Sequence, residues 1–255
     1  MKILNIALYL ICSILFFEAT AQDSKMATVK GGVYIPLYGA DNKTVKVAPF
    51  LMDVYPVTNA DYLKFVQEYP KWKKSKVISL FADKSYLTKW EDDETYSGLP
   101  NAPVTNVSWF AAKNYCECQG KRLPEMDEWE YAAMANENVP DARKIKSYNQ
   151  FILTWYETPR TFNNPIGESV KNYWGIYDLH GLVWEWTQDF NSVLISGESR
   201  KDQDKDSNLF CGSAAIGASD LMNYAAFMRF AFRGSMKARY SSQNLGFRCV
   251  KDIEN

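Results

Sequence analysis

The stretch GIYDLHGLVWEW, residues 175–186, places two short apolar and aromatic runs around a single histidine, His180. Runs of this kind predict strands at about 173–179 and 183–188. His180 is the only histidine in 255 residues. One histidine cannot build a three-histidine zinc site, nor an iron site of two histidines and a carboxylate, within one chain. We therefore interpret His180 as a hydrogen-bonded structural residue.

Helices and further strands are predicted around this stretch. Thr58, Ser108 and Pro124 are suited to the N-terminal ends of three helices, each followed by apolar residues at helical spacing. Strands are expected within 27–54 and at 245–251, where β-branched residues alternate or cluster between turn signals. From about residue 140 onward we expect mostly loops. No alternating strand–helix series is present, so the fold class predicted is α+β with much irregular backbone.

The composition is that of a globular protein, with 47% hydrophobic and 15% aromatic residues. At ~100–200 residues per domain, the chain is one large domain or two small ones. Its formal net charge is −1, and acidic and basic residues are mixed along it. A nucleic-acid-binding domain usually shows a basic excess or stripe, so no nucleic-acid partner is expected. A basic run at 71–76 and an acidic run at 91–94 are interpreted as solvated surface.

The first residues have the pattern of a secretory signal peptide. Lys2 supplies a positive start, residues 3–17 are almost wholly apolar, and small residues follow at Ala19 and Ala21. The alternative is a membrane anchor, but a spanning helix needs ~20 apolar residues and this run is shorter. We expect cleavage after Ala21, a domain at 22–255 without a transmembrane segment, and a secreted or periplasmic location.

Four cysteines remain after that cleavage: Cys116, Cys118, Cys211 and Cys249. In an oxidising compartment they allow three pairings, and the sequence does not choose among them. Cys116 and Cys118 are too close for an easy mutual disulfide. Metal binding by these two thiols is the weaker interpretation, because histidine partners and a second pair of closely spaced cysteines are missing.

Several segments together resemble one known family, the sulfatase-modifying factors, whose best-known members are formylglycine-generating enzymes. The resemblance covers residues 28–251, and the joint order and spacing of the segments make it specific. The segments are PVTNADYLKF (56–65), PVTNVSWFAAKNYC (103–116), GKRLPEMDEWEYAA (120–133), GIYDLHGLVWEW (175–186) and NLGFRC (244–249).

The resemblance implies a single loop-rich formylglycine-generating-enzyme-like domain, related to C-type lectins. It also implies a disulfide between Cys116 and Cys249, which would join the central helix to the C-terminal strand. In the best-known members, oxygen, copper and two cysteines convert a cysteine of a sulfatase to formylglycine. Other relatives are iron-dependent or non-catalytic, so the family sets the fold better than the function. Iron chemistry is not expected with one histidine.

The catalytic cysteine pair of the family has no counterpart here. In the family the two cysteines lie five apart, shortly before the closing Leu-Gly-Phe-Arg-Cys. Residues 212–248 contain no cysteine. Counting back from Cys249 places the two positions near Asp220 and Ala225, and counting forward from Cys211 places them near Ile216 and Leu221. Neither alignment finds a thiol. Copper binding, which requires a soft thiolate pair, is therefore not expected.

Calcium is implied by the same resemblance at the turn after His180. Relatives bind it there through backbone carbonyls and a glutamate, and calcium takes six to eight oxygen ligands. The matching positions are Gly181, Val183 and Glu185, whereas Leu182 replaces an asparagine. The alternative is that Glu185 is a buried acid satisfied by backbone amides, because buried carboxylates are seldom left unpaired.

Two functional hypotheses follow, and whether the chain is an enzyme stays open between them. The first is a secreted family member without formylglycine activity that binds another extracytoplasmic protein as an accessory component. The second is an oxidoreductase or maturation enzyme acting on a protein substrate, with a rebuilt and copper-dependent pocket. Cys211, Ser213 and Arg233 are its pocket candidates. Arg233 and Arg248 are suited to an anionic group, with internal salt bridges as the alternative.

Overall fold

Three small sheets organise the protein, of which a computed structural model describes residues 25–37, 43–191 and 221–253. Strand β4 (Phe50–Asp53) lies between β1 (Met26–Val29) and β7 (Val250–Asp252), and both neighbours are antiparallel to it. Strands β2 (Gly32–Tyr34) and β3 (Val45–Val47) form a separate antiparallel pair. Strands β5 (Trp184–Glu185) and β6 (Leu245–Gly246) pair in parallel.

The three predicted helices are present. Helix α1 (Asn59–Glu68) begins where the Thr58 hydroxyl accepts a hydrogen bond from the Asp61 amide, and a 3₁₀ turn, η1 (Pro70–Trp72), follows it. Helix α2 (Trp109–Cys118) is capped in the same way by Ser108. Helix α3 (Met126–Ala133) begins with a capping box between Glu125 and Glu128.

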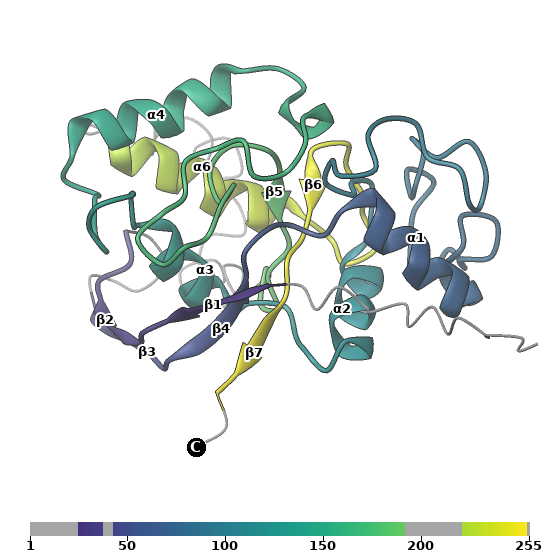
Figure 1. Cartoon of the computed structure of the whole chain (residues 1–255), viewed down its shortest axis with the longest axis horizontal. Coiled ribbons are helices and arrows are strands. Elements are labelled where there is room, and N and C mark those ends of the chain that lie inside the picture. Colours follow the sequence, from purple (N-terminus) through teal and green to yellow (C-terminus); the bar gives the residue numbers. More distant parts are fainter. Residues whose placement is uncertain (1–24, 38–42, 192–220, 254–255) are drawn as a thin grey trace, which may run out of the picture.

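The region after residue 140 is loop-rich as predicted, but it also contains two helices that the prediction missed. Helix α4 (Lys146–Glu157) has no side-chain N-cap, and α6 (Leu221–Ser235) is rich in aromatic residues. Neither has a strong sequence signal, and each is stabilised by packing against the other. Figure 1 shows the two side by side, above β1–β4 and β7 and away from α1 and α2.

The predicted strand at 173–179 is also wrong. The chain turns here, since Gly175 and Asp178 adopt left-handed backbone angles (φ 88° and 62°). The Asp178 carboxylate accepts hydrogen bonds from the amides of Gly167 and Ser169, which holds the turn in place. The strand predicted at 183–188 shortens to β5. A second 3₁₀ turn, η2 (Thr161–Asn163), lies upstream.

The basic run at 71–76 and the acidic run at 91–94 contact each other. Lys73 forms an ion pair with Glu94 (2.6 Å), and the Ser75 amide and hydroxyl both donate to Asp93. These contacts join the two ends of the 71–94 segment, although most of the side chains in the two runs remain exposed.

Two remaining predictions concern the N-terminal segment and membrane-spanning helices. The predicted signal sequence, residues 1–21, lies outside the described residues. None of the helices that the structure describes is long and apolar enough to cross a membrane.

A disulfide joins Cys116 at the end of α2 to Cys249 beside β7, the pairing that the resemblance implies. Both cysteines are fully buried, whereas Cys118 is a half-buried free thiol. The bond closes a long loop, since its cysteines are 133 residues apart.

Replacing both Cys116 and Cys249 with alanine should lower the free energy of unfolding by about 4–5 kcal/mol, because the loop entropy of the unfolded chain is restored. Guanidinium unfolding of the oxidised protein measures this. Cys118→Ala serves as the matched control and should unfold near the wild-type midpoint. Equal midpoints for the double variant and the control would contradict the structural role of the bond.

Candidate functional site

The turn after His180 is held by a buried ion pair rather than by backbone amides. The Arg248 guanidinium donates to both carboxylate oxygens of Glu185 at 2.8–3.0 Å, and both side chains are fully buried. The Trp129 indole N–H also donates to Glu185, at 2.7 Å. The remaining guanidinium N–H groups donate to the carbonyl oxygens of Asp53, Val54 and Tyr177.

These contacts bear directly on the calcium candidates. The Glu185 carboxylate is already occupied by a cation and an indole donor, so it does not fit a calcium ligand in this arrangement. The carbonyls of Gly181 and Val183 remain as candidates from the predicted set. Within the described residues, no three His, Cys, Asp or Glu side chains converge as a metal site. A calcium site at this turn, which the resemblance implies, would have to form without the Glu185 carboxylate.

His180 is buried and hydrogen-bonded, as predicted for a structural residue. Its ring Nε2 lies 3.0 Å from the carbonyl oxygen of Ala133, so Nε2 carries the proton and donates. Burial, together with the positive charge of nearby Arg229, lowers the pKa of His180 to about 3. The ring is therefore neutral at physiological pH. Its Nδ1 has no hydrogen-bond partner among the described residues.

A second charged cluster joins α3 to α6. Glu130 of α3 accepts hydrogen bonds from Arg229 (2.7 Å) and Arg233 (2.6 Å) of α6, and both arginines are about 95% buried. The Arg233 guanidinium also lies over the ring of Trp129, 4.9 Å from its centroid. Although burial raises the pKa of Glu130, the two arginines outweigh it and lower the value to about 2.

The cluster lines a small cavity of about 40 Å³ between α3, α6 and the segment after β2, with His180 at its wall. A larger cavity of about 200 Å³ lies on the other side of His180, where α4 meets the 169–180 turn. Of the three pocket candidates, Arg233 lines the smaller cavity, but its charge is paired with Glu130. Cys211 and Ser213 lie outside the described residues.

One of the positions matched to the family's cysteines, Ala225, is buried and lines neither cavity. Ala225 lies on α6, is fully buried, and packs against Tyr148 and Ile152 of α4. Its matched partner, Asp220, lies outside the described residues. In the part of the chain that the structure describes, Cys118 is the only free thiol. It lies at the end of α2 and lines neither cavity, so a two-thiolate copper site does not fit these residues.

Sequence reasoning missed Glu130. Glu130 nevertheless lies four residues after Met126 and three before Ala133, on the face that turns toward the smaller cavity. A carboxylate on such a face needs a cationic partner, and the arginines four apart on α6 are that partner.

The fold and these buried clusters define a class: a loop-rich α+β domain whose core is connected by buried arginine–glutamate pairs. A profile described as "Sulfatase-modifying factor enzyme 1-like domain" matches residues 15–253. The chain belongs to this family.

Individual relatives agree with this assignment. The mouse formylglycine-generating enzyme is 28% identical, covering 90% of this chain and 75% of its own. The enzyme of Streptomyces coelicolor is 29% identical over 85% of this chain and 84% of its own. The bovine "Inactive C-alpha-formylglycine-generating enzyme 2" is 29% identical over 82% and 79%. The solved structure of PvdO from Pseudomonas aeruginosa has a similar fold (TM-score 0.51, 18% identity, 91% and 96% coverage).

Substituting Glu130→Gln should lower the free energy of unfolding by about 3–5 kcal/mol at pH 7, because two buried arginines lose their counter-charge. The pKa of Glu130 is lower in the folded protein than in the unfolded chain. Its contribution to the free energy of unfolding is therefore present above pH 4.5, near the unfolded pKa, and is lost as the pH falls toward 2. The difference from wild type should therefore shrink below pH 4.5. Urea unfolding across this range tests it, with exposed Glu157→Gln as the control.

Calcium should leave the melting temperature unchanged at millimolar concentration, relative to a chelator, because Arg248 already neutralises Glu185. Differential scanning calorimetry measures this. A rise of several degrees would instead support calcium binding at the carbonyls of Gly181 and Val183.

Proposed function

We propose that this family member does not form formylglycine and acts as a binding or accessory component of an extracytoplasmic assembly. The observation that carries the proposal is the α6 region. Residues 212–248 contain no cysteine, and the matched position Ala225 is packed inside a helix contact. The reaction of the family needs a thiolate pair at this place. The bovine relative that is named inactive is 29% identical to this chain, about as similar as the relatives named as enzymes, which supports the view that the fold persists without the activity.

An extracytoplasmic location is part of the proposal. The signal-like pattern at residues 1–21 supports it, and so does the buried disulfide between Cys116 and Cys249, since stable disulfides form mainly in oxidising compartments. The partner proposed is another extracytoplasmic protein. The rival enzyme hypothesis includes a copper-dependent pocket, so elemental analysis of the purified protein discriminates: stoichiometric copper would favour the enzyme, and calcium alone would favour the binding component.

The purified protein should leave a cysteine-containing sulfatase peptide unmodified in the presence of copper and oxygen. Mass spectrometry of the peptide, with aldehyde trapping, measures the conversion of cysteine to formylglycine. The formylglycine-generating enzyme of Streptomyces coelicolor serves as the positive control. Aldehyde formation by this protein above the enzyme-free level would overturn the proposal.

A further inference from the structure

The outer side of the central sheet is polar and carries a lysine at its edge. Residues Thr28, Leu51 and Lys251 are aligned across β1, β4 and β7, one from each strand. Their neighbours Val29, Phe50, Met52 and Val250 are buried in the core, as the period of two in a strand requires, whereas Asp252 at the end of β7 is exposed. Lys30, two residues beyond Thr28, is exposed and follows the same alternation.

The β2–β3 pair continues this outer side. Val33 of β2 lies opposite Lys46 of β3, and both are exposed. On the inner side, Tyr34 and Val47 pack into the same hydrophobic cluster as the inward residues of β1, β4 and β7. Because both sheets cover one core, their outer faces lie on the same side of the molecule. Figure 1 shows the five strands along one side of the fold.

Positive charge collects on this surface, although the whole chain has a net charge of −1. Lys30, Lys46 and Lys251 form no ion pair among the described residues. The carboxylates of these strands are already engaged, since Asp53 binds Lys121 and Asp252 binds Arg122. Two more exposed lysines, Lys25 and Lys43, lie at the strand ends.

Exposed apolar side chains lie among these lysines. Val33 is 60% exposed and Ile35 47%, and both extend from the β2 segment. Ile253, just after β7, is 38% exposed, and Leu51 at the centre is half-buried. We call this surface the lysine face, made of Lys30, Val33, Ile35, Lys46, Leu51 and Lys251.

We propose that the lysine face docks on the surface of an anionic phospholipid bilayer. Lysines near such a surface gain electrostatic attraction to the headgroups, and exposed aliphatic side chains between them can enter the headgroup region. A soluble polyanion would use the lysines but would leave Val33 and Ile35 without a role. The combination of free lysines and exposed aliphatic residues therefore favours lipid over polyanion.

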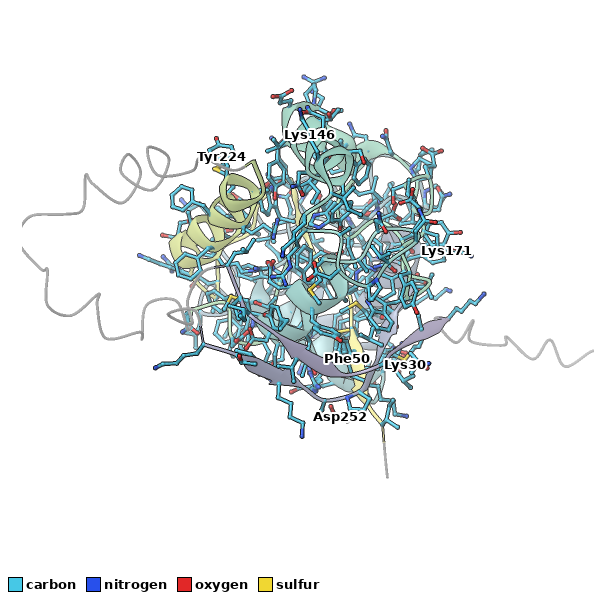
Figure 2. The ribbon with its side chains drawn as sticks, turned by 90° about the vertical axis from the view of Figure 1, so that its left-hand side faces the viewer. Lys30, Phe50, Lys146, Lys171, Tyr224 and Asp252 are labelled. Carbon is cyan, nitrogen blue, oxygen red and sulfur yellow. A yellow bond between two sulfur atoms is a disulfide. The ribbon has the colours of Figure 1, made fainter. Side chains whose placement is uncertain are left out.

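Flotation of the full chain with vesicles tests the proposal. Binding should occur to vesicles of phosphatidylcholine with phosphatidylglycerol, weaken in high salt, and be absent with phosphatidylcholine alone. The double variant Lys46→Glu with Lys251→Glu should bind at least tenfold more weakly, since each lysine contributes roughly fivefold. The matched control, Lys146→Glu with Lys171→Glu, changes the net charge equally. Figure 2 shows Lys146 at the far end of the molecule from Phe50 and Asp252.

A second pair of substitutions separates lipid from other anions. Val33→Thr with Ile35→Thr keeps β-branched residues in the strand and should weaken vesicle binding severalfold while leaving dextran sulfate binding unchanged. Circular dichroism verifies that each variant is folded. The proposal is overturned if vesicles with phosphatidylglycerol are not bound, if the control loses as much binding as the lysine-face variant, or if only dextran sulfate is bound.

Discussion

The buried ion pair between Arg248 and Glu185 connects more of the structure than any other side-chain contact described. It brings together the segment before the C-terminal strand, the turn after His180 and the carbonyls at the end of β4, and both side chains of the pair are fully buried. A charge in such surroundings is tolerated only when its partner and its remaining N–H groups are satisfied, and here all of them are. The segments that carry these groups must therefore adopt their positions together.

Glu130 with Arg229 and Arg233 repeats this arrangement on the other side of Trp129. The cluster joins α6 to α3 and lines the smaller cavity. The scaffold motifs of the family are kept in this chain, and these residues of α6 hold the helix against α3. Membership in the family thus sets the fold more firmly than the chemistry.

The sequence was informative where local signals are strong. Thr58, Ser108 and the residues after Pro124 define three helices through caps and apolar spacing. The sequence did not predict helices α4 and α6, because their stability comes from packing against each other, and no local sequence pattern reports such packing. The sequence did not predict the lysine face for a related reason. Lys251 lies about two hundred residues after Lys30 and Lys46, and only the strand pairing brings the three onto one surface. The partner of Glu130 was equally hidden, because it lies about a hundred residues away.

The pairing of β7 with β4 has a consequence for the order of folding. Strand β7 ends at Asp252, yet it completes the sheet begun by β1, and Val250 also pairs with Arg122 beside α3. The core cannot close around Arg248 until the segment from Arg122 to Val250 has been made, since long-range contacts must wait for their last partner. During synthesis, the closing of this core therefore has to wait for β7 to emerge.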